Sequence, residues 1–197
     1  MLFQGLDFSL SEGELLHLHG HNGSGKTTLL RTVCGLILPS SGQVLWNGAD
    51  ISDLHEDFTA EVVYIGHKRA IKDDLSGLEN LQISCVLDGA PISEQQAWDA
   101  LDKIGLRGFE DLPTKVLSQG QKRRVGLARL LVNKSKLWVL DEPFNALDKA
   151  AVGLLQSVIR EHVAGGGMVL LTTHQEVSLT QGEVRSLQLG VGGAGHV

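Results

Sequence analysis

A glycine-rich segment has the residue types and spacing of a loop that binds phosphate. Residues 20–27 read Gly-His-Asn-Gly-Ser-Gly-Lys-Thr and match the pattern G-x-x-x-x-G-K-[ST]. The glycines let successive main-chain N–H groups point at one anion, and a following helix adds the positive end of its dipole. Lys26 would place a charge beside the β- and γ-phosphates, and the Thr27 hydroxyl can bind Mg²⁺. The expected nucleotide-binding residues are Gly20, His21, Asn22, Gly23, Ser24, Gly25, Lys26, Thr27 and Thr28.

Two adjacent carboxylates follow an apolar run that is typical of a buried strand. The run is Leu137–Leu140, and Asp141 and Glu142 come directly after it. Asp141 could hold a metal ion through water, and Glu142 could polarise an attacking water as a general base. Taken alone the pair could also be a solvated acidic turn, but the phosphate-binding pattern upstream favours the metal and water chemistry.

Two further polar residues, Ser118 and His174, indicate a function only in combination with the other motifs. Ser118 is a good N-cap for a helix, and the open amides of such a helix start could form a second anion site. His174 follows the apolar run Met168–Thr172 and could be a ligand at a sheet edge. Taken alone, each is explained better as a structural residue, Ser118 as a helix cap and His174 as a satisfied histidine.

The hydrophobic pattern predicts the elements that must position these residues. We expect strands at 6–10, Leu15–His19, Val44–Trp46, Val62–Ile65, Leu137–Leu140, Met168–Thr172 and Val184–Leu189. Asn47-Gly48 predicts a hairpin turn. A helix follows the phosphate-binding pattern through Leu29, Leu30, Val33 and Ile37, weakened by Gly35 and stopped by Pro39. Further helices are expected within 75–131, one of them capped by Ser93 and Gln96, and at 150–163. Alternating strands and helices predict an α/β fold, with one domain over 1–197, a helical insertion at about 75–131 and a flexible tail at 190–197.

Composition narrows the classes of protein further. The chain is 42% hydrophobic, and 17 basic against 23 acidic residues give a net charge of −6. No basic block is present, so a nucleic-acid partner is disfavoured. The two cysteines form no CxxC pair, which favours a reducing compartment over a disulfide or zinc framework. Neither a secretory signal nor a membrane-spanning run is recognised, so we expect the chain not to cross a bilayer by itself.

In this order, the motifs resemble those of the ATPases of ATP-binding-cassette (ABC) systems. The resemblance implies a P-loop NTPase fold with a RecA-like parallel-sheet core, a small antiparallel β subdomain and a helical signature subdomain. It implies ATP and Mg²⁺ as cofactors, with Thr27 and Asp141 at the metal and Glu142 and His174 as catalytic residues. The signature segment, which would act on ATP bound to a second subunit, would be Leu117, Ser118, Gln119, Gly120 and Gln121, and 145–148 would be the D-loop. Two subunits would then close head to tail around ATP and move membrane-embedded partners.

A narrower resemblance is to the haem-exporter ATPases of bacterial cytochrome c maturation. It rests on 44–48, 64–67, 108–113, Leu137-Trp138 and 142–144. This chain and the haem-exporter group both have a histidine, here His67, where most ABC ATPases have a glutamine. The neutral imidazole of His67 could bind Mg²⁺ or water; the alternative is that His67 is only an exposed loop residue. This resemblance implies an ATP-driven haem translocase: a homodimer with integral membrane subunits and a haem chaperone. It would lie peripherally on the cytoplasmic face of the inner membrane of a Gram-negative-type bacterium.

Three interpretations remain open at this point. They are the haem-handling complex, another small ABC transporter with a different cargo, and an ABC ATPase that works away from membranes. The resemblance implies a first strand and an adenine-stacking aromatic residue that would lie before Met1, and we expect Phe3 to pack in the core rather than to stack on the base. His17 and His19 share one strand face, and we expect them to be packing residues rather than metal or haem ligands.

Overall fold

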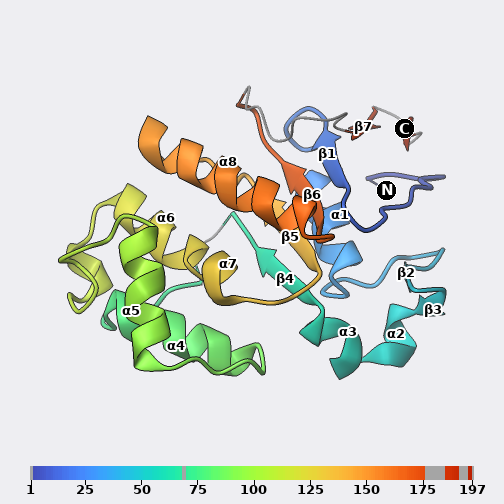
Figure 1. Ribbon diagram of the computed structural model, residues 1–197. Helices are drawn as coiled ribbons and strands as arrows, with labels where there is room; N and C mark the ends of the chain where they lie inside the picture. Colours follow the sequence, from blue (N-terminus) through green and yellow to red (C-terminus); the bar gives the residue numbers. More distant parts are fainter. Residues whose placement is uncertain (1, 68–69, 176–184, 191–194, 197) are drawn as a thin grey trace.

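Parallel strands form the centre of the molecule, as the computed structural model shows (Figure 1). The structure describes residues 2–67, 70–175, 185–190 and 195–196. Within these residues the main sheet has six strands in the order β4-β5-β6-β1-β7-β8, of which β8 alone is antiparallel to its neighbour. The strands are β1 (Leu15–His19), β4 (Val62–Ile65), β5 (Leu137–Asp141), β6 (Met168–Thr172), β7 (Arg185–Leu189) and β8 (Gly195–His196). The predicted α/β fold with a parallel-sheet core is confirmed.

Helices cover both faces of the sheet, which explains why its central strands are apolar throughout. On one face, α8 (Lys149–Ala164) packs Leu155 and Ile159 against Leu140 of β5. On the other, α1 (Lys26–Val33) packs Leu29 and Leu30 against alternate residues of the same strands. Successive strand residues thus point into different apolar clusters, as in parallel sheets generally.

The helix after β1 is shorter than predicted. α1 ends at Val33, and Gly35 has a φ of 71°. The N–H of Gly35 donates to the Thr32 carbonyl at 3.0 Å, and the N–H of Leu36 donates to the Arg31 carbonyl at 2.9 Å. These two bonds form a Schellman motif, which glycine favours because it has no Cβ. The expectation that the helix continues to Ile37 was therefore wrong, since Gly35 ends the helix rather than weakening it.

The predicted strand at 6–10 does not form, although its pattern has a structural cause. Leu6, Phe8 and Leu10 are half-buried against the α1-side cluster, while Asp7 and Ser9 are exposed. None of these residues belongs to a ladder in the part of the chain that the structure describes. The alternation reflects a segment with one face buried against the protein. A segment can bury one face in this way without pairing with another strand. Phe3 packs on the same cluster, as expected.

A small antiparallel hairpin lies apart from the main sheet. β2 (Leu45–Trp46) pairs with β3 (Ala49–Asp50) across Asn47 and Gly48. The positive φ angles of these two residues, 52° and 84°, form the turn that the Asn-Gly pair predicts. Two short helices follow, α2 (Ile51–Leu54) and α3 (Glu56–Ala60).

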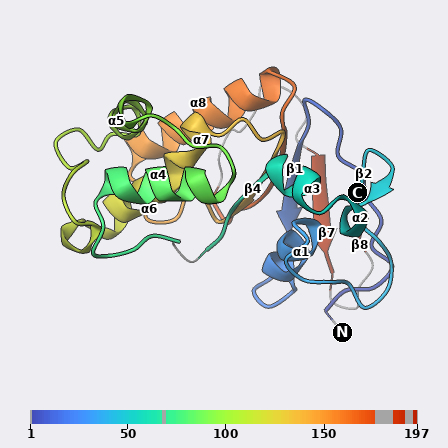
Figure 2. The same ribbon diagram turned by 90° about the horizontal axis from the view of Figure 1, so that it is seen from below.

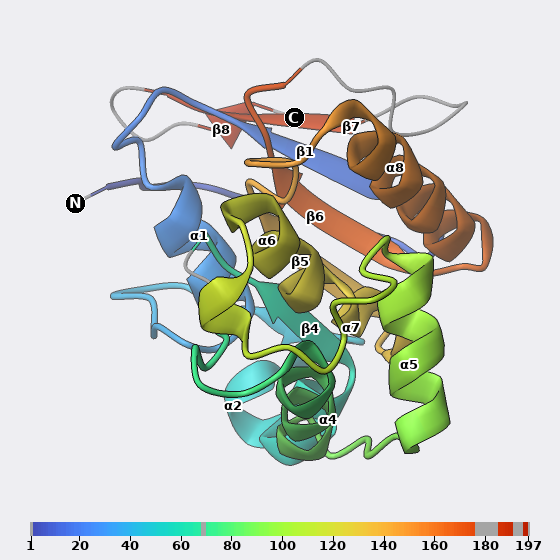
Figure 3. The ribbon, with the colours of Figure 1, turned by 90° about the vertical axis from the view of Figure 1, so that its left-hand side faces the viewer.

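The helices predicted within 75–131 pack together at one end of the molecule, opposite the hairpin (Figure 2). We call them the helical layer; its members are α4 (Gly77–Leu87), α5 (Glu94–Lys103), the 3₁₀ turn η1 (Thr114–Val116), α6 (Gln119–Leu127) and α7 (Arg129–Val132). Capping boxes begin α4, α5 and α6, including the predicted pair Ser93 and Gln96. Leu101 and Leu106 share one apolar cluster with Val63 and Leu140 of the sheet, so the layer is continuous with the core. Figure 3 shows α4, α5 and α6 in front of the sheet.

Some expectations concern residues outside the described part of the chain. Val184 and residues 191–194 and 197 lie there. The flexible tail expected at 190–197 thus stays a prediction, while Gly195 and His196 pair with the end of β7. In the described ranges, no helix combines the length and apolarity needed to span a membrane.

Candidate active site

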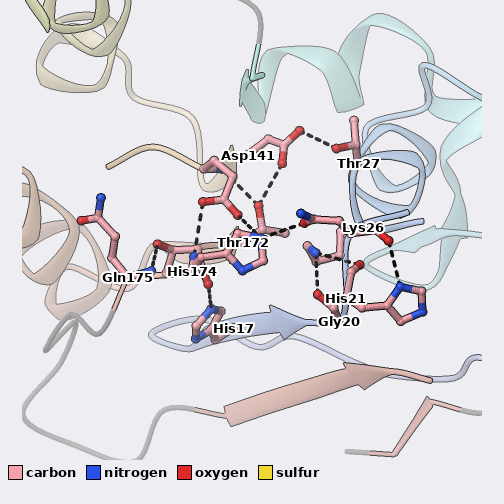
Figure 4. A network of polar contacts seen from close by, with 12 residues as sticks. His17, Gly20, His21, Lys26, Thr27, Asp141, Thr172, His174 and Gln175 are labelled. Carbon is pink, nitrogen blue, oxygen red and sulfur yellow. Dashed lines mark hydrogen bonds and ion pairs between the residues drawn. The ribbon is translucent and has the colours of Figure 1, made fainter. Parts of the chain in front are cut away.

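The polar residues singled out in the sequence meet where parallel strands end (Figure 4). β1 ends at His19 and leads directly into residues 20–27, which we call the phosphate loop. β5 ends at Asp141, and β6 at Thr172. Parallel strands bring their carboxyl ends to the same sheet edge, where open α/β sheets bind ligands.

The start of α1 is left open toward this edge. Gly25 occupies the N-cap with a φ of 101°, and no side chain caps the helix. A Cβ at Gly25 would lie 3.1 Å from the Leu2 Cβ and 3.2 Å from the Phe3 ring, so the fold requires a glycine there. The buried Ser24 hydroxyl has no hydrogen-bond partner among the residues described. Uncapped amides and an orphaned buried hydroxyl together form a cradle suited to an anion.

Lys26 folds back across its own loop. Its Nζ donates to the Gly20 carbonyl at 2.6 Å and to the His21 carbonyl at 3.2 Å. The ammonium therefore stays at the mouth of the cradle, where it can exchange these carbonyls for phosphate oxygens.

Asp141 connects the phosphate loop to two strands. The Thr27 hydroxyl donates to one carboxylate oxygen at 2.8 Å, and the Thr172 hydroxyl donates to the other at 2.9 Å. Asp141 itself is 2% exposed. The result is a fixed group of hydroxyl and carboxylate oxygens beside the cradle.

Glu142 is held in a backbone conformation that non-glycine residues rarely adopt. Its φ is 50°, and its N–H points at both the carbonyl and the hydroxyl of Thr172, at 3.2 and 3.1 Å. The His174 N–H donates to Oε2 of Glu142 at 3.3 Å, and His174 Nε2 lies 3.5 Å from Oε1. Oε1 accepts no hydrogen bond from the described residues. Strain and an unsatisfied buried oxygen are typical of functional positions.

His174 bridges the carboxylate and the phosphate loop. Its Nε2 also lies 3.2 Å from Oδ1 of Asn22. Below it, the rings of His17 and His19 are in contact, with centroids 3.6 Å apart and planes tilted by 42°, and His17 Nε2 lies 3.2 Å from the Thr173 carbonyl. Burial, reinforced by the charge of His19, lowers the pKa of His17 to about 4. Burial, and then the charge of Lys26, lowers the pKa of His19 as well. Both rings are therefore neutral near pH 7, which agrees with the expected packing role.

The signature segment, residues 117–121, lies at the start of α6. Leu117 is buried and Ser118 is exposed. Ser118 and Gln121 close a capping box, with bonds of 3.2 and 2.9 Å. A Cβ at Gly120 would lie 2.8 Å from the Ala146 carbonyl, so this glycine allows close contact with the expected D-loop. His67 follows β4 with an exposed side chain.

The structure thus brings together the phosphate loop, Asp141, Glu142 and His174, whereas Ser118 and His67 extend into solvent. Thr172 was missed by the sequence analysis, although it contacts both carboxylate residues. A threonine that ends an apolar strand beside the acidic pair was the available signal.

This combination of fold and site defines a class of protein. The sequence profile described as "ABC transporter" matches residues 3–145. The chain belongs to this family, as an ATP-binding and ATP-hydrolysing subunit, and the expected class is confirmed. Similar solved structures include a putative ABC transporter ATP-binding protein from Pyrococcus furiosus, with 26% identity, a TM-score of 0.77 and 91% and 86% of the two chains covered. Another is the ATP-binding cassette MJ0796, a dimer in a post-hydrolysis state bound to ADP and Pi, with 25% identity, a TM-score of 0.74 and coverage of 88% and 80%.

Curated relatives narrow the class to particular proteins. The chain is 55% identical over 188 residues to the cytochrome c biogenesis ATP-binding export protein CcmA of Nitrosomonas europaea, covering 95% of this chain and 88% of that one. It is 53% identical to the protein of the same name in Dechloromonas aromatica, covering 96% and 93%. The names of these relatives confirm the narrower resemblance to the ATPases of bacterial cytochrome c maturation.

Proposed function

We propose that this chain is the ATPase subunit of an export complex that serves cytochrome c biogenesis, where it drives haem transport or haem release from a chaperone. The observation that carries the ATPase role is the cluster of Thr27, Asp141, Thr172, Glu142 and His174 beside the uncapped start of α1. The names of relatives that are about half identical to this chain support cytochrome c biogenesis.

The phosphate loop, with Thr28, would hold the nucleotide's phosphates. The open amides of α1 and the Ser24 hydroxyl supply donors at the cradle. Lys26 gives up its bonds to Gly20 and His21 and pairs with phosphate oxygens instead. None of these donors needs to break a strong bond to a carboxylate first, so little energy is lost on binding.

The oxygen donors at Thr27 and Asp141 fit a magnesium ion, which prefers hard oxygen ligands. Thr172 orients one carboxylate oxygen of Asp141 and leaves the other directed at Thr27. When bound, Mg²⁺ supplies positive charge against the phosphate oxygens. His67 is a further, peripheral candidate for this site or its water.

Glu142 is placed to accept the proton of the attacking water. Its Oε1 is buried and free of hydrogen bonds from the described residues, so a water molecule can donate to it. His174 contacts both Glu142 and Asn22 of the phosphate loop, so it can position the carboxylate relative to the γ-phosphate. Thr172 holds the main chain of Glu142.

A second subunit would complete the site from outside. Ser118 is exposed at a helix start, so its hydroxyl and the neighbouring amides are accessible to a ligand on another subunit. We propose a head-to-tail homodimer in which this signature segment covers the partner's ATP. Integral membrane subunits would then dock beside His67 and the helical layer. We further propose that 1–197 is one domain with an inserted subdomain at about 75–131, peripheral to the cytoplasmic face of the inner membrane, without a nucleic-acid partner.

The Glu142→Gln variant tests the ATPase role. MgATP binding should persist, turnover should fall by at least about 100-fold, and closed dimers should accumulate with ATP, because the amide cannot accept the water's proton. Calorimetry, phosphate release and light scattering measure the three quantities. Glu12→Gln, on an exposed residue, is the matched control. Turnover by Glu142→Gln at the rate of that control would contradict the proposed base.

The biogenesis role is tested in the bacterium that carries the chain. Replacement of the chromosomal copy with the Glu142→Gln variant should abolish covalent haem staining of c-type cytochromes while b-type haem spectra persist. Membrane subunits should co-purify with the tagged wild-type chain. Normal c-type cytochromes in the variant strain would contradict this role and leave the ATPase assignment untouched.

A further inference from the structure

A buried cation in the helical layer contacts the main chain of the active site. Arg123 lies on α6 and is 6% exposed. Its guanidinium donates to the carbonyls of Gly66 at 3.0 Å, Asp141 at 3.2 Å, Glu142 at 2.9 Å and Pro143 at 3.3 Å. A planar fork of donors suits such a cluster, whereas the point charge of a lysine cannot reach all four oxygens.

These carbonyls belong to the ends of two neighbouring strands. Gly66 follows β4 and precedes His67, and the other three residues end β5 or follow it. β4 and β5 pair in parallel, so their ends lie side by side at the active-site edge. The Arg123 side chain therefore binds the sheet at two points: where β4 leads into His67, and where β5 leads into Glu142.

The peptide of Glu142 is fixed from both sides. Thr172 accepts from its N–H, and Arg123 donates to its carbonyl. A φ of 50° at a non-glycine residue costs about 1 kcal/mol or more, and it persists only where the surroundings enforce it. Without Arg123, the carbonyl side would be free to relax, and the carboxylate would swing away from its aim.

Further bonds tie the residues that precede α4 to the same helical layer. The Asn80 side chain accepts from the Lys72 N–H at 2.7 Å and donates to its carbonyl at 3.0 Å. Lys122, next to Arg123 on α6, pairs with Asp73 at 2.6 Å. Lys72 and Asp73 are therefore bound to α4 and α6.

We propose that Arg123 is a positioning residue for ATP hydrolysis, which aims the Glu142 carboxylate only while α6 is seated against the ends of β4 and β5. The proposal rests on the proposed ATPase site. It makes hydrolysis depend on the position of the helical layer, since a displacement of α6 that strains the bonds of Arg123 also releases the backbone of Glu142.

The test compares Arg123→Lys and Arg123→Met in the purified full chain. We expect kcat to fall about 10-fold for lysine and about 100-fold for methionine, in line with the loss of charge-assisted hydrogen bonds, while KM and MgATP affinity stay within about 2-fold. The controls are Arg107→Lys and Arg107→Met, because Arg107 pairs with Asp102 on the surface with 82% of its side chain exposed. Thermal melting establishes that each variant is folded, and if Arg123→Met does not fold, Arg123→Lys carries the test.

A double-mutant comparison separates positioning from a general structural role. In the Glu142→Gln background, Arg123→Lys should lower the residual turnover by less than about 2-fold, because there is no carboxylate left to aim. A further 10-fold loss there would overturn the proposal, as would a kcat equal to that of Arg107→Lys or a parallel loss of ATP affinity. If the wild-type chain does not bind MgATP, the proposed function itself fails, and this inference fails with it.

Discussion

The starts of α1 and α6 are both expected to face phosphate, but their N-terminal amides are left in different states. α1 begins at Gly25 without a side-chain cap, next to a buried hydroxyl that lacks a partner among the described residues. α6 begins at Ser118, and a capping box satisfies the N–H groups of Ser118 and Gln121. An anion site needs donors that are not already bonded. α1 can therefore accept phosphate directly, whereas in the proposed dimer α6 would meet the ligand of the partner subunit and exchange its cap there.

Their surroundings reinforce the difference. α1 lies at the sheet edge, within reach of Asp141 through Thr27. α6 extends the exposed Ser118 outward and is anchored behind by Arg123 and by an Arg124–Asp148 ion pair. One helix start is therefore built into the site of its own subunit, and the other presents an exposed serine while its far side is bound to the core.

The largest expected effect comes from the open helix start. Lys26→Ala should weaken MgATP binding by at least about 100-fold, because the only full charge at the mouth of the phosphate loop among its described residues is lost. Calorimetry measures the affinity. Lys134→Ala, on an exposed lysine, should bind normally, and a Lys26→Ala variant that binds as tightly would break the comparison.

Ser118→Ala should separate binding from turnover. We expect unchanged ATP affinity in the single subunit, a turnover about 30-fold lower, and a stability loss of about 1 kcal/mol from the missing cap. The partner-subunit role is checked by mixing this variant with Lys26→Ala, since one composite site of the mixed dimer then carries both defects and the other carries neither. The mixture should recover part of the turnover that both variants lack. No recovery would show that Ser118 acts within its own subunit.

Ser24→Ala tests whether the buried Ser24 hydroxyl serves phosphate binding or the fold. The hydroxyl is buried without a partner in the described structure, so its removal should leave unfolding free energy unchanged or raise it by up to about 1 kcal/mol. ATP affinity should nevertheless fall about 5-fold, because a donor to phosphate is lost. Urea titration and calorimetry on one preparation test both. A loss of stability equal to the loss of binding energy would mean that the hydroxyl serves the fold instead.

The last prediction concerns folding stability rather than ATP binding or turnover, and it involves His17 and His19 beneath the site. Burial, then the charge of His19, lowers the pKa of His17 to about 4, whereas an unfolded histidine titrates near about 6.5. Between these values the unfolded chain binds more protons, so stability falls as pH decreases from about 6.5 to 4. His17→Gln should remove part of this fall, about 1–2 kcal/mol after allowance for partial exposure. Urea titrations at pH 7 and 5 measure it, with the exposed His55→Asn as control; an unchanged pH slope in His17→Gln would contradict the assignment.

Short-range signals predicted the parts of the fold that depend on neighbouring residues. The Asn47-Gly48 turn, the Ser93 capping box and the apolar strands β4, β5 and β6 all formed as expected. Gly35 was misjudged because a helix end and a weak helix position look alike in sequence. The alternation at 6–10 was misjudged because a covered face does not specify a hydrogen-bonded neighbour.

The sequence alone determined which residues could bind phosphate and metal, because that chemistry resides in residue types at fixed local spacing, as in residues 20–27 and Asp141-Glu142. Only the tertiary structure decided which of them meet. It brought Thr172 to both carboxylate residues and placed Arg123 under the backbone of Glu142, 19 residues away in the chain. Such contacts depend on the order and register of strands that are distant in sequence, and no local pattern encodes them.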